Sequence, residues 1–427
     1  MSNLDLSVEI GGVIFQNPIL PGSSDIILDE RGVEKCLEQG IGGIVTKTFG
    51  TVTGETAFRI RPYHFHYRVF GKAFENSWIT RGAGHPMPAK EAAAKLVPGM
   101  AKLCHEAGVP LVVSIGAGPI DDWVDYAKRM EQAGADMLEL NFGHLRQLNT
   151  PTGIPLYWDI PTTAEIVKAV KKAVKVPLSP KGALNITAFQ THLKGLVEAG
   201  IDCYTVRYPE RMGMMIDIEE EVPFGCIGTS ESVAGRANLS AGIFRVVQAR
   251  QVTDIPLIAS GGAYEATDAI MYLLVGATLV EVCRAIYVKG WRVYSQIIEG
   301  IEEWMVSKGY SSLKDFRGNA LELAMKEPSE DFLHTEPFLM PQEKSSPIIP
   351  EVDMDECTLC RRCEDFCLSG VFSVDKANRT VNIDHEHRCW GCGDCVGWCP
   401  SDAIKLIDKE TKEVVWANQG LAKPYRP

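Results

Sequence analysis

Two short cysteine runs near the C-terminus restrict the fold of that segment more than any other feature of the chain. Both runs have the spacing C-x2-C-x2-C-x3-C, and they comprise Cys357, Cys360, Cys363, Cys367, Cys389, Cys392, Cys395 and Cys399. Three thiolates of such a run can cap one cubane cluster while the fourth ligates the other. The spacing therefore predicts two [4Fe–4S] clusters, one held by Cys357, Cys360, Cys363 and Cys399 and the other by Cys389, Cys392, Cys395 and Cys367.

A pair of structural zinc sites is the alternative, but zinc sites usually use paired C-x2-C knuckles. A disulfide scaffold is disfavoured because the chain is long and its N-terminus lacks a signal peptide's basic and apolar regions. The segment resembles a bacterial-type two-cluster ferredoxin domain. One departure is Leu368, which stands where proline usually follows the fourth cysteine.

Upstream of the cysteines, short apolar runs alternate with segments whose apolar residues have helical spacing. Eight runs are strand candidates, at residues 17–22, 43–48, 109–115, 137–141, 177–181, 203–208, 256–260 and 279–283. Eight βα units predict an α/β fold, the (β/α)8 TIM barrel. A doubly wound open sheet is the alternative. The Gly11-Gly12 pair predicts a hairpin before the barrel.

The βα rhythm ends after Gly318, where residues rich in Pro, Ser and Glu follow. We expect the barrel at residues 1–318, a linker at 319–349, an α+β ferredoxin-like domain at 350–410 and a tail at 411–427. The net charge of −12 argues against a nucleic-acid partner. No apolar stretch approaches the ~20 residues of a membrane helix, so we expect no membrane span and a cytoplasmic location.

Polar or glycine residues stand at the carboxyl ends of the predicted strands, where barrel enzymes carry their chemistry. They are Ser23, Lys47, Asn141, Lys181, Tyr208, Ser260, Gly261, Gly262, Cys283 and Arg284. The Gly261-Gly262 turn precedes a helix, and backbone N–H groups there can bind an anion, although tight packing also explains the pair. The alternative for Lys47 and Lys181 is a solvated surface charge.

The barrel resembles the dihydroorotate and dihydropyrimidine dehydrogenase family of FMN enzymes. The matching segments are NPILPGSS, IVTKT, LELNF, SPKGALNIT, IASGG, LVGATLVEVCRAI and GYSSLKDFRG. The resemblance implies FMN, with Gly22, Ser23, Lys47, Asn141 and Lys181 around the ring and ribityl chain. Ser260, Gly261, Gly262, Cys283 and Arg284 would hold its phosphate. Lys181 is the candidate to neutralise charge at flavin N1/O2, and Lys47, taken also as catalytic, places the ring.

The chain departs from this family where the proton donor is expected. The family's Cys or Ser after the fourth strand is absent, and His144 occupies its place, with Tyr157 as a second candidate acid. A histidine can donate a proton near neutral pH; the alternative is a loop histidine without a role. Asn76 and Asn141 match amide-reading positions of the family, whereas Arg207 and Tyr208 replace its Asn-Thr pair, so the ring substrate need not be uracil or thymine.

No G-x-G-x-x-G follows a predicted strand, so we expect electrons from a separate FAD/NAD(P)H-dependent subunit or a ferredoxin, in a homo- or hetero-oligomer. The expected reaction is hydride transfer from FMN to a C=C bond conjugated to a carbonyl in a cyclic, dihydropyrimidine-like substrate, or its reverse. A dihydroorotate-type oxidase and an electron-transfer subunit without its own substrate are the alternatives.

Overall fold

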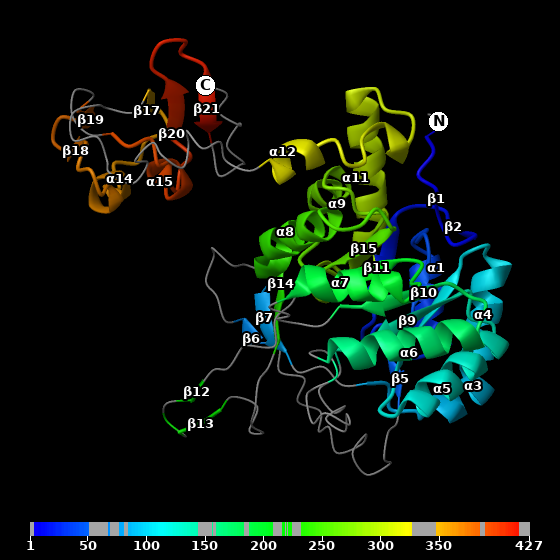
Figure 1. Ribbon diagram of the computed structural model, residues 1–427. Coiled ribbons are helices and arrows are strands. Elements are labelled where there is room, and N and C mark those ends of the chain that lie inside the picture. Colours follow the sequence, from blue (N-terminus) through cyan, green and yellow to red (C-terminus); the bar gives the residue numbers. More distant parts are fainter. Residues whose placement is uncertain are drawn as a thin grey trace. The chain divides into compact units, whose positions relative to one another are not determined.

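The computed structural model describes residues 4–50, 67–68, 77–80, 84–143, 156, 159–182, 188–207, 216–217, 219, 221–223, 232–326, 347–384 and 389–417. The chain forms two compact units, Met1–Lys326 and Glu327–Pro427 (Figure 1). Each unit has a hydrophobic core of its own.

A barrel of eight parallel strands forms the centre of the first unit. In sheet order, the strands are β3 (Ile19–Pro21), β16 (Leu279–Val282), β15 (Leu257–Ser260), β11 (Tyr204–Arg207), β10 (Leu178–Lys181), β9 (Met137–Asn141), β8 (Leu111–Gly116) and β4 (Ile44–Val45). A short strand, β5 (Phe49–Gly50), also pairs with β8. Between β4 and β3, the Gly42 N–H donates to the Ile19 carbonyl at 3.0 Å. All eight predicted apolar runs are barrel strands, which confirms the TIM-barrel prediction.

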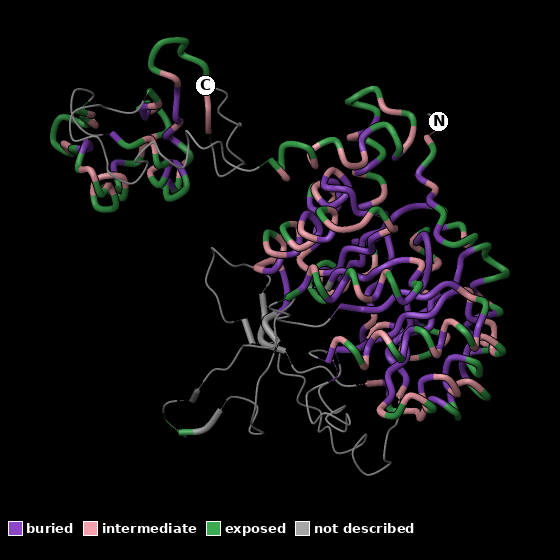
Figure 2. Tube along the Cα trace, viewed as in Figure 1, coloured by how far each residue is buried: buried purple, intermediate pink, exposed green. Residues whose placement is uncertain are grey.

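Helices cover the outside of this barrel (Figures 1 and 2). They are α1 (Glu30–Leu37), α3 (Ala89–Lys95), α4 (Val97–Glu106), α5 (Ile120–Gln132), α6 (Ile160–Ala173), α7 (Phe189–Glu198), α8 (Leu239–Arg250), α9 (Ala266–Leu274), α10 (Ile286–Lys289), α11 (Val293–Lys308) and α12 (Leu321–Met325), with 3-10 turns η3 (Arg236–Asn238) and η4 (Leu313–Asp315). Helix α5 shows why they pack there, because its buried residues Trp123, Tyr126, Ala127 and Met130 recur at helical spacing on one face.

The predicted hairpin is present as β1 (Val8–Ile10) and β2 (Val13–Phe15). Gly11 and Gly12 have φ values of 57° and 86°, which suit a two-residue turn. A Cβ on Gly11 would lie 2.7 Å from the Pro177 ring, which precedes β10. The hairpin therefore packs at the amino end of the strands and leaves the carboxyl end for the site.

The remaining strands of the first unit lie outside the barrel sheet. One antiparallel sheet has the order β14 (Ser232–Gly235), β7 (Ser77–Thr80) and β6 (Tyr67–Arg68), and β12 (Ile216–Asp217) pairs with β13 (Val222–Pro223).

The second unit is an α+β fold with short elements. Its strands are β17 (Ile348–Val352), β20 (Ile404–Asp408) and β21 (Val414–Ala417) in one sheet, and β18 (Phe372–Asp375) and β19 (Thr380–Ile383) in another; its helices are α14 (Arg362–Phe366) and α15 (Asp394–Gly397). Strand β21 extends the sheet into the segment expected as a tail. Helix α12 likewise continues the first unit past residue 318, since the Gly318 and Ala320 N–H groups bond to the end of α9.

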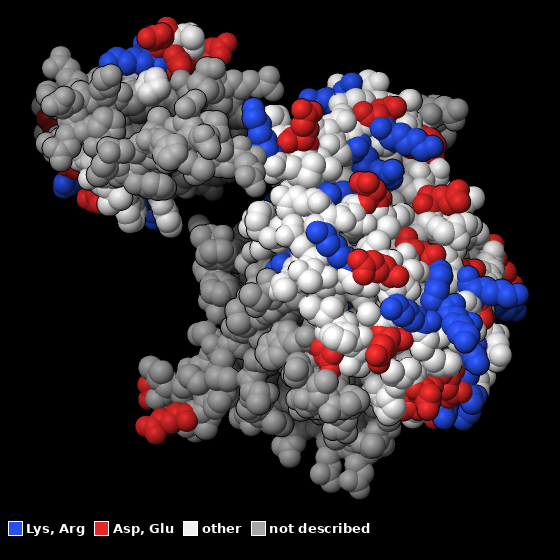
Figure 3. All heavy atoms as spheres, viewed as in Figure 1, with Lys and Arg blue, Asp and Glu red and all other residues white. Residues whose placement is uncertain are grey.

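Lys and Arg side chains are interspersed with Asp and Glu over the visible face of the first unit (Figure 3). Among the helices in the described parts of the chain, none is long and apolar enough to cross a membrane.

Candidate active site

Strand register brings the predicted polar residues to one end of the barrel. Asn141 on β9 lies opposite Lys181 on β10, and Ser260 on β15 lies opposite Glu281 on β16. Asn141, Lys181 and Ser260 are buried, as is Lys47 just after β4. These lysines are therefore not solvated surface charges, and the burial of each requires a partner.

Lys47 is held by the loop that follows β3. Its Nζ lies 2.7 Å from Asp25 Oδ1, and its backbone N–H donates to the Ile27 carbonyl at 3.1 Å. Ser24 of the same loop is buried, and its Oγ has no hydrogen-bond partner among the described residues. Because buried hydroxyls are normally hydrogen-bonded, this orphan atom fits a polar ligand at the mouth of the barrel.

A hydroxyl network joins four elements beneath this loop. Asn141 Nδ2 donates to Thr48 Oγ1 at 2.9 Å, while Ser23 Oγ and Ser114 Oγ lie 3.2 Å and 2.9 Å from the same Thr48 oxygen. Ser114 Oγ donates in turn to Glu139 Oε1 at 2.8 Å. The network fixes the Asn141 amide, whose oxygen also accepts from the Gly143 N–H at 3.0 Å.

Lys181 is bound to two carboxylates. Its Nζ lies 2.9 Å from Glu139 Oε2 and 2.8 Å from Glu281 Oε2, and both glutamate side chains are only 1% exposed. β10 and β16 are not neighbours in the sheet, so these side chains meet inside the barrel. Burial raises the pKa of the Glu139 carboxyl to about 7, with Lys181 opposing and Glu281 adding to the shift.

The Gly261-Gly262 turn after β15 is tightly packed. Gly262 has a φ of 77°, and a Cβ there would lie 2.5 Å from the Leu239 nitrogen at the start of α8. The two N–H groups just before α9 are already used, because Asp268 Oδ2 accepts from the Tyr264 and Glu265 N–H groups at 2.8 Å and 3.1 Å. An anion here would thus not be held by those two amides.

Gly22 and the end of β16 complete this side of the barrel. The Gly22 N–H donates to the Val282 carbonyl at 3.1 Å, and a Cβ on Gly22 would lie 3.1 Å from the Cys283 Cβ. Cys283 and Arg284 are half-buried, and the Arg284 guanidinium carbon lies 5.2 Å from the centre of the Tyr287 ring. A side chain at position 22 would therefore crowd Cys283.

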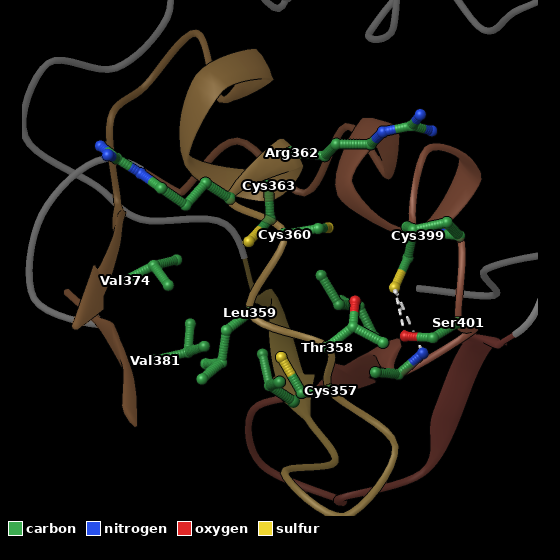
Figure 4. Close-up of a pocket in the computed structure, with 15 residues that line it drawn as sticks. Cys357, Thr358, Leu359, Cys360, Arg362, Cys363, Val374, Val381, Cys399 and Ser401 are labelled. Carbon is green, nitrogen blue, oxygen red and sulfur yellow. Dashed lines mark hydrogen bonds between the residues drawn. The ribbon is translucent and has the colours of Figure 1, made fainter. Parts of the chain in front are cut away.

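In the second unit, four cysteines surround one cavity (Figure 4). They are the predicted ligands of the first cluster, Cys357, Cys360, Cys363 and Cys399. The rest of the lining includes the apolar Val352, Leu359, Val374 and Ile404 and the polar Thr358, Arg361, Arg362 and Ser401. The Cys399 sulfur also accepts from the Ala403 N–H at 3.2 Å, a contact of the kind that tunes cluster potentials. Four thiols around one cavity are compatible with a [4Fe–4S] cluster.

The other four cysteines are neighbours as well. Burial raises the pKa of the Cys395 thiol to about 12, and the nearby thiols of Cys392, Cys389 and Cys367 add to the shift. Cys367 belongs to the first run in sequence but lies with the second run in space. This proximity is compatible with the predicted second ligand set, which stays a prediction.

Four predicted site residues lie outside the described residues, namely Asn76, His144, Tyr157 and Tyr208. Arg207 is the last residue of β11. Their roles stay predictions.

Comparison with known proteins agrees with this geometry. The sequence profile of the dihydroorotate dehydrogenase family matches residues 5–305, and that of the 4Fe-4S dicluster domain matches residues 348–403. The chain belongs to the dihydroorotate dehydrogenase family. Membership of this family implies a flavin oxidoreductase that uses FMN and acts on CH–CH bonds, and the second domain implies bound iron–sulfur.

Relatives of this dehydrogenase family differ in how much of the chain they cover. The NAD-dependent dihydropyrimidine dehydrogenase subunit PreA of Escherichia coli K12 is 25% identical over 423 residues, which is 97% of this chain and 98% of the relative. The catalytic subunit of dihydroorotate dehydrogenase B (NAD(+)) from Thermococcus kodakarensis is 27% identical, over 75% of this chain and 100% of the relative. The corresponding Methanothermobacter thermautotrophicus subunit is 28% identical over 74% of this chain and 98% of the relative.

Sequence reasoning missed five residues of the site. Asp25, Thr48, Glu139 and Glu281 contact predicted residues directly, and Ser114 links Thr48 to Glu139. The glutamates carried a signal, since each is the lone charge inside an apolar strand of the dehydrogenase barrel, in MLELN and LVEV. A charge at such a position is rarely buried unless it is paired, so the pattern indicates an internal cation.

Proposed function

We propose that the protein is an FMN enzyme that reduces, or reversibly oxidises, a C=C bond conjugated to a carbonyl in a cyclic, dihydropyrimidine-like substrate. The observation that carries this proposal is that one chain combines buried lysines and amides at the barrel mouth with a unit of eight cysteines. The likeness to a dihydropyrimidine dehydrogenase subunit extends over both parts, whereas the dihydroorotate dehydrogenase relatives cover about three quarters of the chain.

The residues at the strand ends fit FMN. Gly22, Ser23, Lys47, Asn141 and Lys181 would surround the ring and ribityl chain, and Ser260, Gly261, Gly262, Cys283 and Arg284 would hold the phosphate. When bound, FMN supplies hydride chemistry and the conversion between one- and two-electron transfers. Support comes from the orphan Ser24 hydroxyl, whereas the close packing of Gly262 against the start of α8 explains that glycine without a ligand.

The side chains have separate tasks in this proposal. Asp25 orients the Lys47 ammonium, and Thr48 orients the Asn141 amide, so both groups are fixed before substrate binds. Asn76, Asn141, Arg207 and Tyr208 would bind the substrate, and His144 would donate the proton that completes reduction, with Tyr157 as the alternative acid. A positioned acid of this kind accelerates a reaction roughly 100- to 10,000-fold.

Two [4Fe–4S] clusters would deliver the electrons. The cavity formed by Cys357, Cys360, Cys363 and Cys399 supports the first, and the proximity of Cys367 to the other three thiols supports the second. The electron source would be a separate FAD/NAD(P)H-dependent subunit or a ferredoxin.

The experiment is an anaerobic screen, monitored by flavin absorbance, of cyclic enones, pyrimidines and orotate against the reduced protein and of dihydropyrimidines and dihydroorotate against the oxidised protein. We expect bound FMN whose reduced form is reoxidised by a pyrimidine-like or related conjugated carbonyl compound. Turnover restricted to dihydroorotate would show a biosynthetic oxidase instead. A flavin that no substrate reoxidises would indicate an electron-transfer subunit, and protein without FMN would overturn the proposal.

A further inference from the structure

A buried group of three charges lies inside the barrel, below the strand ends. Lys181 donates to Glu139 and Glu281, and the three side chains are at most 4% exposed. With both carboxyls ionised the group would carry one net negative charge in a place from which water is excluded. Such an uncompensated charge is costly, so any further negative charge added nearby favours uptake of one proton by the group.

A chain of hydroxyl groups connects Glu139 with the mouth of the barrel. Ser114 Oγ donates to Glu139 Oε1 at 2.8 Å, so its own oxygen is left to accept from Thr48 Oγ1, 2.9 Å away. Thr48 Oγ1 in turn accepts from Asn141 Nδ2, and Ser23 Oγ lies 3.2 Å from it. Ser23 is only half-buried. Every hydrogen bond in the chain can point toward Glu139, which is the arrangement that proton transfer along hydroxyls requires.

We propose that Glu139 takes up a proton through Ser23, Thr48 and Ser114 when negative charge is added at the strand ends, and releases it by the same route. This inference rests on the proposed function, because reduction of a flavin at that position is what adds the charge. In this proposal Glu139 accepts a proton from solvent and is distinct from the acid that protonates the substrate.

The proton balance of the step is simple. A proton from solvent binds the Ser23 oxygen, each hydroxyl passes one proton to the next and receives one, and the Glu139 carboxylate gains an O–H. No electron moves in this step, and the group formed with Lys181 and Glu281 changes from a net charge of −1 to 0. Reoxidation reverses it.

The titratable neighbours of Glu139 in the described parts of the barrel are consistent with this role. The pKa of Glu139 is lowered by Lys181 from β10 and raised by Glu281 from β16. Glu139 in turn raises the pKa of the Cys203 thiol just before β11. Burial, which is the largest influence, raises the Glu139 pKa. The carboxyl is therefore able to bind a proton near neutral pH, where an exposed glutamate would not.

The test is infrared difference spectroscopy of the holoenzyme on anaerobic reduction, in H2O and D2O. We expect the carbonyl band of a newly protonated carboxylic acid, shifted in D2O, and its complete loss in Glu139→Gln, which keeps the side-chain shape. Ser114→Ala should retain the band but slow its appearance. Ser179→Ala is the matched control, because its buried hydroxyl is 2.8 Å from Thr205 Oγ1 and outside the chain; it should behave as wild type.

Each failure has a separate meaning. Protein that binds no FMN would refute the proposed function. Protein whose FMN is reduced without a carboxylic-acid band, or with a band that persists in Glu139→Gln, would refute this inference alone. Loss of the band only in Glu281→Gln would show that the proton binds Glu281 instead of Glu139, which would also refute this inference.

Discussion

Replacing Lys181 by methionine should destabilise the barrel by an amount that depends on pH. Methionine keeps the length of the side chain but removes the ammonium that lies 2.9 Å from Glu139 and 2.8 Å from Glu281. Removing one partner of a buried ion pair costs about 3–5 kcal/mol, because the remaining charge is left buried and unpaired. We expect a loss of that size at pH 7.5.

The pH dependence follows from the Glu139 carboxyl. Burial raises its pKa and Lys181 opposes that shift, so without Lys181 the folded-state pKa lies further above that of the unfolded chain. The folded state then binds more protons than the unfolded chain, and stability is greatest at low pH. It falls as pH rises, by about 1.4 kcal/mol per pH unit for each proton retained. The variant should therefore recover about 1 kcal/mol relative to wild type when the pH is lowered from 7.5 to 6.

Urea unfolding followed by far-ultraviolet circular dichroism at both pH values measures this difference. Lys171→Met is the control, because Lys171 pairs with Asp202 in a partly exposed position and should cost about 1 kcal/mol or less at either pH. Adding Glu139→Gln to the Lys181 variant should restore part of the stability at pH 7.5. A loss below about 1 kcal/mol, or one that is the same at both pH values, would refute the proposed charge group.

Three further predictions address the other parts of the site. His144→Asn should lower turnover roughly 100- to 10,000-fold without changing FMN content; near-normal kcat between pH 6 and 8 would transfer the role to Tyr157. Gly262→Ala should weaken FMN binding, measured by fluorescence titration, because its Cβ would collide with the backbone at the start of α8. Gly108→Ala is the control and should not weaken binding, because Gly108 has a similar φ of 66° and a Cβ there would have no atom within 4 Å. Equal effects of the two substitutions would contradict the packing argument. Cys395→Ser should lower iron from about eight to about four atoms per chain; unchanged iron would exclude this thiol as a ligand.

The barrel strands were predictable because apolar runs of strand length, separated by helical segments, have few other packings. The Gly11-Gly12 turn was predictable for a local reason, since its positive φ values suit glycine. The domain boundaries were harder to predict from the sequence. Helix α12 joins the first unit through hydrogen bonds to the end of α9, a tertiary contact that no local pattern in residues 318–326 reveals.

The residues of the candidate site were predictable from the sequence, but the pairing of their charges was not. Strand ends identified Lys47, Asn141 and Lys181 because all parallel strands finish at the same end of a barrel. That Lys181 faces two glutamates depends on β10 and β16 meeting across the interior, which requires the three-dimensional closure of the sheet. The use of the amides just before α9 by Asp268 was likewise hidden, since a capping carboxylate and a bound anion fit the same sequence pattern.

We propose that one chain carries an FMN together with two [4Fe–4S] clusters as one electron-transfer system. An anaerobic reductive titration of the purified protein, monitored by visible absorbance and electron paramagnetic resonance, counts its electron capacity directly. We predict about four electron equivalents per chain, about two for FMN and about one for each cluster. A capacity of about three would leave only one cluster, and a capacity of about two, confined to the flavin, would contradict the cluster relay.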